Sequence, residues 1–371
     1  MKTILKKYSY DDVLLVPRKS SILPKEVTIE SKLTEKIKLQ IPIIASPMDT
    51  VTESKMAIKM AQIGACGIIH KNMSYEEQIA EIKKVKEAEA LEGSTLGLDG
   101  KLFVGISVSH SVTKEDAARL VEAGADALCL DSAHGHSKNI LSKAQMIKEW
   151  FPNIQLIAGN VATTEGARAL AKAGVDAIRV GVGPGAICTT RVVTGVGVPQ
   201  LSAVMDAVEG VKGTNTKIIA DGGLKTSGDM AKALAAGAHA VMIGSMAAGT
   251  EEAPGERIFI NDKPFKMYRG MGSIGAMKKG SGDRYGQDGI KTAEKLVPEG
   301  VEGLIKYKGH IEDAIHQYVG GIRASFGYVG ATTIRDFWER AVFVEITTAG
   351  LNESHPHSLD SFEKTTNYGG K

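Results

Sequence analysis

A cysteine at the end of a glycine-rich loop is the residue best suited to covalent chemistry. Cys188 follows the loop 181–187, and the loop follows an apolar run, 176–180. Glycines let a backbone adopt unusual dihedral angles and expose its amides and carbonyls. A thiolate held there could attack an electrophilic carbon of a bound ligand. A lone cysteine, however, is more often a small packing residue.

Small and polar residues follow several other apolar runs. They are Ser46, Asp131, Asn160, Asp221-Gly222-Gly223 and Gly244-Ser245, and the apolar Met48 lies close behind Ser46. Adjacent glycines offer amides to a phosphate group, and an aspartate can accept hydrogen bonds from a ribose diol. The same residues also occur in ordinary turns. They indicate a nucleotide site only if the fold gathers them around the cysteine.

A repeated helix-to-strand pattern indicates the fold that would gather them. Helix-like segments end at Gly64, Gly124, Gly174 and Gly237, and a short apolar strand follows each glycine. A glycine can stop a helix, and uninterrupted apolar strands indicate a parallel sheet covered on both faces. The predicted strands are 41–46, 66–69, 102–106, 128–131, 154–158, 176–180, 217–220 and 241–243.

Strands that alternate with helices in this way favour an α/β fold, the (β/α)8 TIM barrel. The alternative is an open doubly wound sheet. The active site of a barrel lies at the carboxyl ends of its strands, and phosphate commonly binds after the last two. We therefore expect a single catalytic barrel over residues 1–371, with its site at the residues named above.

Three segments do not fit the alternating pattern. Residues 91–100 form a short linker, residues 263–309 a long polar insertion, and residues 350–371 a polar extended arm. Long insertions in compact domains are usually lids or binding loops, so we expect 263–309 to be a flap or finger. Its basic residues, Arg284 included, are also typical of a solvated lid face.

Composition excludes several classes of protein. The net charge of +2 gives no indication of nucleic-acid or membrane binding. The N-terminus lacks the apolar core of a signal peptide, and no run is long and apolar enough to span a bilayer. The three cysteines lack metal-ligand spacing, and Cys66 and Cys129 lie in apolar runs typical of packing residues. We expect a cytoplasmic location.

Short motifs along nearly the whole chain carry a family resemblance. They lie at 11–17, 48–53, 70–73, 131–136, 181–200, 220–223, 268–273, 283–285 and 295–300. In this order they resemble the inosine-5′-monophosphate (IMP) dehydrogenases, most closely the bacterial type.

The resemblance implies NAD-dependent oxidation of IMP to xanthosine 5′-monophosphate (XMP), the committed step of guanine nucleotide synthesis. Cys188 attacks C2 of the hypoxanthine ring, the adduct passes a hydride to NAD+, and water hydrolyses the remaining thioimidate. Before hydrolysis a mobile flap enters the vacated nicotinamide site. It carries Arg284 as the base that activates water, with Tyr285 beside it and Thr190 as an auxiliary base. The role of Arg284 is unusual, because a guanidinium ordinarily stays protonated.

The resemblance also implies the binding residues. Asp221 contacts the ribose of IMP, and glycines with Tyr268 contact its phosphate. The full IMP set is Ser46, Met48, Ala186, Asp221, Gly222, Gly223, Gly244, Ser245, Tyr268, Arg269, Gly270, Met271, Gly272 and Glu299. The NAD+ set is Asp131, Asn160, Gly181, Val182 and Gly183. Carbonyls of Gly183, Gly185 and Cys188 bind K+, and Glu353, Ser354 and His355 of a neighbouring subunit complete that site, which implies a homotetramer.

The chain departs from the family pattern in three places. Ala186 stands where a serine commonly contacts the phosphate, and Gly286 stands where an aromatic residue is common. The family usually carries a paired regulatory CBS module where this chain has only residues 91–100. The short linker is consistent with a natural short form or with an engineered removal.

Two other functions remain open. GMP reductase shares the barrel, the cysteine loop and Thr190, lacks the regulatory module, and deaminates GMP to IMP with NADPH. The flap pair Arg284-Tyr285, the segment 271–277 and Val198-Pro199 favour the dehydrogenase. The third reading is a nucleotide-binding barrel without catalysis, which would need an inactive Cys188 or flap.

Overall fold

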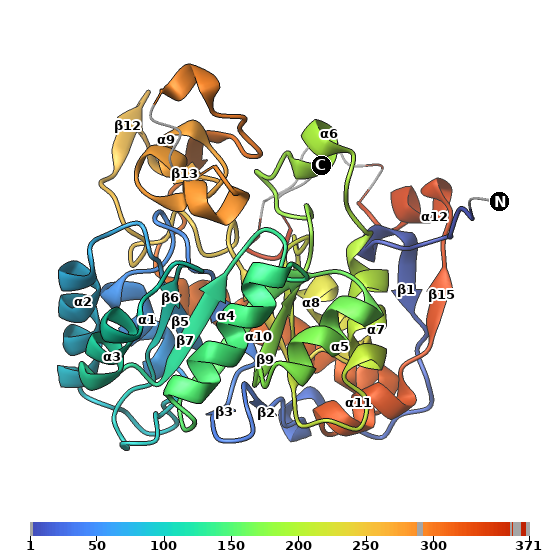
Figure 1. Ribbon diagram of the computed structural model, residues 1–371. Coiled ribbons are helices and arrows are strands. Elements are labelled where there is room, and N and C mark those ends of the chain that lie inside the picture. Colours follow the sequence, from blue (N-terminus) through green and yellow to red (C-terminus); the bar gives the residue numbers. More distant parts are fainter. Residues whose placement is uncertain (1–2, 288–291, 357, 359–364, 369–371) are drawn as a thin grey trace.

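A closed barrel of parallel strands forms the centre of the molecule (Figure 1). The computed structural model describes residues 3–287, 292–356, 358 and 365–368. In chain order the barrel strands are β4 (Ile43–Ala45), β5 (Cys66–Ile69), β6 (Gly105–Val108), β7 (Ala127–Asp131), β8 (Gln155–Val161), β9 (Ala177–Val180), β10 (Lys217–Asp221) and β11 (Ala240–Ile243). Strand β11 pairs with β4 and closes the ring. The predicted (β/α)8 barrel is confirmed.

Helices cover the outside of the barrel. They are α1 (Ser54–Gln62), α2 (Tyr75–Glu87), α3 (Lys114–Glu122), α4 (Lys138–Trp150), α5 (Thr164–Lys172), α7 (Gln200–Gly210), α8 (Ser227–Ala235) and α10 (Ile311–Val329). Local signals set their ends. Thr113 and Thr163 cap α3 and α5 by accepting an amide hydrogen bond. Gly124, with φ +109°, follows α3 in the left-handed region that favours glycine.

Two layers of apolar side chains hold the barrel together. Alternate strand residues point inward and outward, so Ile44 packs inside the ring while Ile43 packs against the helices. Cys66 and Cys129 are fully buried in the inner layer, and burial raises the pKa of the Cys66 thiol. A short hairpin, β2 (Ser31–Lys32) and β3 (Lys38–Leu39), adds apolar residues to the inner layer.

A finger rises above one side of the barrel (Figure 1). Its antiparallel sheet consists of β12 (Ile258–Ile260), β13 (Lys263–Arg269) and β14 (Glu302–Lys306). Between β13 and β14 lie α9 (Ile274–Lys278) and two 3-10 helices, η3 (Ser281–Tyr285) and η4 (Ala293–Lys295). The first strand of the finger thus begins before residue 263, the predicted start of the insertion.

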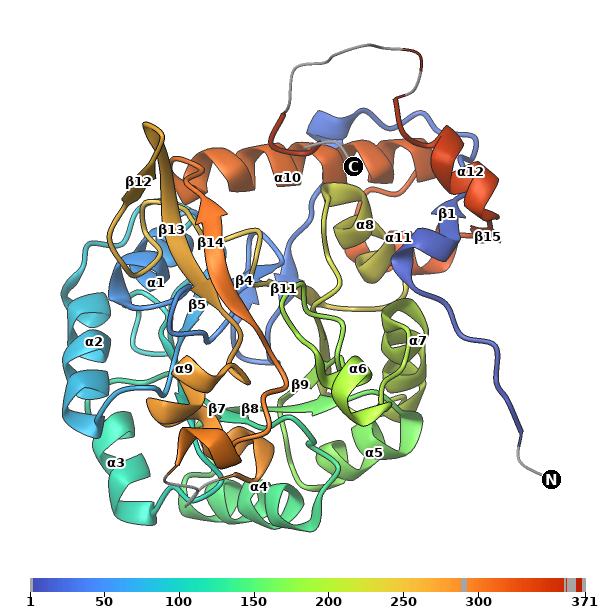
Figure 2. The ribbon, with the colours of Figure 1, turned by 90° about the horizontal axis from the view of Figure 1, so that it is seen from above.

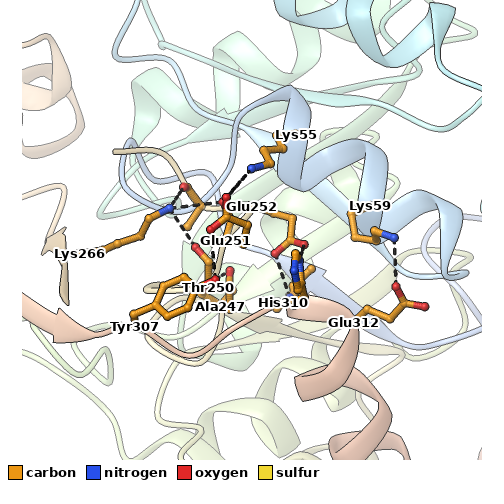
Figure 3. Close-up of polar contacts among 12 residues, drawn as sticks. Lys55, Lys59, Ala247, Thr250, Glu251, Glu252, Lys266, Tyr307, His310 and Glu312 are labelled. Atoms are coloured by element: carbon orange, nitrogen blue, oxygen red, sulfur yellow. Dashed lines mark hydrogen bonds and ion pairs between the residues drawn. The ribbon is translucent and has the colours of Figure 1, made fainter. Parts of the chain in front are cut away.

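A polar cluster joins the base of the finger to the barrel (Figure 3). The ammonium of Lys266 on β13 is buried and donates to the carbonyls of Thr250 at 3.0 Å and Ala253 at 2.5 Å. The carboxylate of Glu251 lies between them in sequence and pairs with Lys55 of α1 at 3.0 Å. One loop after β11 therefore binds both the finger and an outer helix.

The linker and the C-terminal segment both pack on the barrel. Residues 91–100 run back on themselves, and Lys86 pairs with Asp126 at 2.8 Å and with Asp99 at 3.0 Å. Helix α11 (Ile334–Arg340) leads to β15 (Phe343–Glu345), which pairs with β1 (Val13–Leu15).

The segment that the sequence indicates as an extended arm begins within a helix, α12 (Thr348–Glu353). Residues 357, 359–364 and 369–371 of that arm lie outside the described residues. In the part of the chain that the structure describes, no helix has the length and apolarity needed to cross a membrane.

Candidate active site

A cavity of about 340 Å³ opens at the carboxyl ends of the strands, within the size range of small-molecule sites. Seen from above, β13 and β14 cross one side of the ring of strands (Figure 2). Twenty of the residues expected at the site line this cavity. They are Ser46, Met48, Asn160, Gly181, Gly183, Gly185, Ala186, Cys188, Asp221, Gly222, Gly223, Gly244, Ser245, Tyr268, Gly270, Met271, Gly272, Arg284, Tyr285 and Glu299.

The cysteine loop joins the barrel to the finger. The amide of Thr189 donates to the carbonyl of Glu299 at 2.9 Å, and the amide of Val301 donates to the carbonyl of Ile187 at 3.0 Å. The partly buried thiol of Cys188 lies 3.2 Å from the hydroxyl of Thr190, the first residue of α6 (Thr190–Thr194). The thiol is thus held at the cavity wall with a polar partner beside it.

Arg191 supports the shape of this loop through hydrogen bonds to two backbone carbonyls. Its guanidinium donates to the carbonyl of Val182 at 3.1 Å and to that of Val198 at 2.5 Å. A Cβ on Gly183 would lie 2.5 Å from Cγ of Arg191, and one on Gly197 would lie 2.6 Å from it. Glycine is required at both positions because the arginine stem occupies that space.

Backbone amides and one phenol gather at the ends of β10 and β11. Gly222 and Gly223 adopt positive φ angles of +96° and +77°. A Cβ on Gly244 would lie 3.1 Å from the hydroxyl oxygen of Tyr268 and 3.2 Å from the sulfur of Met48. Burial raises the pKa of Tyr268, so its hydroxyl keeps a proton to donate. This end of the cavity suits an anionic group.

A buried arginine organises the carboxylates beneath the cavity. Arg179 on β9 donates to Asp131 of β7 at 2.5 Å and to Asp221 of β10 at 2.8 Å. The amide of Asn160 also donates to Asp221, at 2.8 Å. Burial opposes the charge of Arg179, but Asp221 and Cys129 together outweigh burial and raise the pKa of the guanidinium. Both carboxylates therefore face a permanent positive charge.

The flap segment η3 lies against this charged centre. The guanidinium of Arg284 bonds the same oxygen of Asp131 that Arg179 bonds. The carbonyl of Arg284 accepts a hydrogen bond from the amide of Ala133 at 3.1 Å. Tyr285 packs on Gly272 closely enough that a Cβ there would lie 2.8 Å from its ring, and burial raises the pKa of Tyr285.

A family model of the IMP dehydrogenase / GMP reductase domain matches residues 7–357 of this chain. The chain belongs to the IMP dehydrogenase / GMP reductase family.

Curated relatives in this family align along nearly their whole length. Inosine-5′-monophosphate dehydrogenase of Cryptosporidium parvum is 47% identical over 398 residues, which covers 99% of each chain. The enzymes of the same name from Halalkalibacterium halodurans and Streptococcus pyogenes are each 42% identical, over 475 and 484 residues. These alignments cover 97% of both chains for the former, and 99% of this chain and 98% of the relative for the latter. Both alignments exceed the 371 residues of this chain, so these relatives carry additional internal residues.

Two positions that depart from the family pattern have clear surroundings. Ala186 is exposed and lines the cavity, so it offers its backbone but no hydroxyl there. Gly286 ends η3 with φ +66°, and a Cβ there would meet no atom within 4 Å. The left-handed backbone at this residue favours glycine.

Some expected site residues lie away from the cavity wall. Thr190 contacts the thiol of Cys188 but does not line the cavity. The carbonyl of Val182 accepts a hydrogen bond from Arg191. The side chain of Asp131 is fully buried beneath Arg284. Arg269 turns from the cavity and pairs with Asp49 at 2.6 Å. Glu353, Ser354 and His355, at and after the end of α12, are expected to act in a neighbouring subunit, and that role stays a prediction.

Other residues of the site were not predicted from the sequence. Arg179 and Lys225 line the cavity, and Lys71 and Asp49 bind the flap and finger. Arg179 had a signal, because it is the one charged residue in the otherwise apolar strand β9. Lys71 and Asp49 lie in the motifs 70–73 and 48–53, but the motifs did not indicate their partners.

Proposed function

We propose that this chain oxidises IMP to XMP with NAD+, the committed step of guanine nucleotide synthesis. The observation that carries the proposal is the position of Cys188. Its thiol lies on the wall of a cavity whose other walls offer glycine amides and Tyr268 for a phosphate, and Asp221 for a ribose. A nucleoside monophosphate bound in this way places its base near the thiol and the loop 270–272.

Covalent attack divides the oxidation into two steps. The sulfur of Cys188 adds to C2 of the hypoxanthine ring, and the hydride on C2 then departs. This leaves a thioimidate, in which C2 is oxidised and still bonded to sulfur. Water adds to C2, the carbon–sulfur bond breaks, and XMP and the free thiol result. Bound NAD+ supplies the acceptor for the hydride.

The residues expected to hold NAD+ offer suitable acceptor atoms. Among the described residues, Oδ2 of Asp131 and Oδ1 of Asn160 are buried without a hydrogen-bond partner. Such atoms suit the hydroxyls of a ribose, because a buried acceptor gains most from a donor. Gly181 and Gly183 line the same cavity as Asn160.

The flap and the cofactor would use the same carboxylate. Arg284 bonds Asp131 here, so a ribose could reach Asp131 only when the flap has moved. The two halves of the reaction would therefore alternate. With the flap docked, Arg284, Tyr285 and Thr190 surround the thioimidate and direct water to C2.

The cysteine loop also has the groups that a K+ ion prefers. Among the described residues, no three His, Cys, Asp or Glu side chains are placed to hold a metal, so the proposed ligands are the carbonyls of Gly183, Gly185 and Cys188. Carbonyl oxygens replace the hydration shell of K+. Glu353, Ser354 and His355 of a neighbouring subunit would complete the site in a homotetramer.

One pair of assays tests the reaction. The purified protein receives IMP, NAD+ and K+, and the appearance of reduced nicotinamide is followed by absorbance. A second sample receives GMP and NADPH. We expect turnover only in the first. Turnover only in the second would show a GMP reductase, and binding of IMP without turnover in either would show a non-catalytic barrel.

A variant tests the nucleophile. Cys188→Ser should still bind IMP but lose turnover by at least about a thousandfold, because its alkoxide is not accessible at neutral pH. Denaturation during turnover should trap a nucleotide adduct on the unmodified protein and none on the variant, as measured by mass spectrometry. Unchanged turnover in Cys188→Ser would remove this residue from the mechanism.

A further inference from the structure

Two adjacent flap residues of opposite charge pair with two barrel residues of opposite charge. Asp283 pairs with Lys71, which follows β5, and Arg284 pairs with Asp131 at the end of β7. The exposed fractions of these side chains are 6% for Lys71, 11% for Asp283, 13% for Arg284 and 0% for Asp131. Solvent and salt therefore screen these pairs much less than pairs at the surface.

Further contacts at the same place fix the geometry of the flap. The carboxylate that faces Lys71 also accepts the backbone amide of Arg284 at 2.7 Å. Asn72 donates to the carbonyl of Ala276 in α9 at 3.2 Å and to Asp49 at 3.0 Å. The loop after β5 thus holds the flap through Asp283 and through α9.

We propose that Lys71 is a positioning residue for the hydrolytic half of the reaction. Its ammonium docks Asp283 and so aims the guanidinium of Arg284 at the charged centre of the site. This inference rests on the proposed function. Lys71 acts through Asp283, and it touches neither substrate nor water in this role.

The order of Asp283 and Arg284 along the flap also determines which barrel residue each of them can meet. A shift of the flap by one residue would bring Asp283 toward Asp131, or Arg284 toward Lys71, and each contact would join like charges. Contacts that penalise wrong arrangements increase the specificity of docking. The two pairs together allow one docked position, in which Arg284 reaches the site.

Loss of the lysine should affect the two halves of the reaction differently. Without Lys71 the carboxylate of Asp283 would be buried in the docked flap without this cationic partner, which disfavours docking. Hydride transfer needs the flap displaced from Asp131, so it should proceed normally. Hydrolysis needs the flap docked, so it should slow.

Rapid-mixing kinetics tests this difference. In Lys71→Met and Asp283→Asn we expect the first turnover of reduced nicotinamide to stay within about twofold of the unmodified rate, while the steady-state rate falls about tenfold. The covalent Cys188 adduct should accumulate. The double variant should be no slower than either single variant, and Lys71→Arg should recover most of the rate. Lys84→Met is the matched control, because Lys84 also pairs with a carboxylate, that of Glu81 in the same helix, but its own side chain is 60% exposed.

Two other outcomes would overturn the inference. An equal fall of the first turnover and the steady state would show that Lys71 merely supports the barrel. Additive losses in the double variant would show that Lys71 and Asp283 act separately.

Hydrogen exchange separates the inference from the proposed function. The amides of 281–286 should exchange faster in Lys71→Met and Asp283→Asn than in Lys84→Met, whatever reaction the protein catalyses. If the unmodified protein gives no reduced nicotinamide, the proposed function fails while this readout still reports docking. Unchanged exchange would refute the role of Lys71.

Discussion

Arg179 is the residue that makes the charged centre of this barrel stable. Asp131 and Asp221 come from different strands, and the inner layer of the barrel next to them is apolar. Two unpaired carboxylates there would be costly to desolvate, whereas one guanidinium can bond both. The two carboxylates that are proposed to bind riboses are therefore held in place before any ligand arrives.

A second residue, His239, should make the free energy of unfolding depend on pH. It precedes β11, packs edge-on against Trp338, and accepts the amide of Ile218 at 3.2 Å. Burial and the nearby charge of Lys217 lower the pKa of His239 to about 3. Below about pH 6.5 His239 binds a proton in the unfolded chain, whereas in the folded chain it stays neutral until about pH 3. Acid therefore destabilises the fold between these two pH values.

The variant His239→Asn should remove this pH dependence, because its amide oxygen can accept the same hydrogen bond. We expect the stability advantage of the unmodified protein over the variant to shrink by at most about 1.4 kcal/mol for each pH unit below 6.5. Urea unfolding at pH 7 and pH 5 measures this. The exposed His316 supplies the control, His316→Asn. An advantage that stays constant with pH would contradict the argument.

Single residues of the site were predictable only where a local motif carried them. Asp221 ends β10 and Cys188 lies in the loop that follows β9, so their place at the barrel mouth follows from the strand pattern. Lys71 lies 212 residues from its partner Asp283, and Arg179 lies 48 residues from Asp131. Hydrophobic periodicity gives burial, but it does not give which charges meet across a closed ring.

At the scale of elements, the cysteine loop depends on one arginine and the glycines around it. The loop has no regular hydrogen-bond ladder of its own, so its path depends on the bonds of Arg191 to two carbonyls and on the backbone bonds of Ile187 and Thr189 to the finger. Helix α6 continues directly from the loop. A displacement of Arg191 should therefore move Cys188.

Gly183→Ala should cause that displacement. The new Cβ would meet Cγ of Arg191 at 2.5 Å, and the backbone has φ +77°. Gly195→Ala is the matched control, because Gly195 has φ +72° and open space around it. In both variants an alanine in the left-handed conformation costs about 1 to 2 kcal/mol, but only Gly183→Ala forces the loop to shift.

We expect Gly183→Ala to lower kcat for IMP oxidation by about tenfold or more, and Gly195→Ala to change it little. Steady-state kinetics and thermal unfolding of the two variants measure both effects. Similar kcat values in the two variants would show that the backbone conformation, rather than the clash with Arg191, controls the loop.

Elements with a simple pattern were predictable, and those built on tertiary contacts were less so. The barrel strands follow from apolar runs after glycine stops, because burial on both faces leaves a continuous apolar signal. The finger begins with β12, an apolar run of three residues whose side chains are exposed, so the run does not show by itself that this strand pairs outside the barrel. The arm beyond Ala349 is polar in sequence, yet Thr347 caps α12 at its start.

At the scale of the whole molecule, the candidate active site lies at the interface between the barrel and the finger. The barrel supplies Cys188 and Asp221, while the finger supplies Tyr268 and the flap. Tyr268 and Lys266 are two residues apart on β13 and are both buried, so they share one face of the strand. The anchor at the base of the finger and the phenol at the cavity therefore move together.

Lys266→Met should weaken the attachment of the finger to the barrel without unfolding the barrel. The ammonium donates to the carbonyls of Thr250 and Ala253, and the variant would leave these oxygens without that donor (Figure 3). Tyr268 would then lose its fixed place beside Gly244. Because the expected role of Tyr268 is to bind the phosphate, KM for IMP should rise about tenfold while kcat changes less.

Lys263→Met is the matched control for this prediction, because Lys263 is exposed at the start of the same strand. Hydrogen exchange in β13 should increase in Lys266→Met and stay unchanged in Lys263→Met, while the amides of β4 to β11 keep their protection. A loss of protection throughout the barrel would show that Lys266 stabilises the whole fold. Protection lost only in the finger, together with the rise in KM, would show that the barrel folds independently and that the finger's attachment sets substrate affinity.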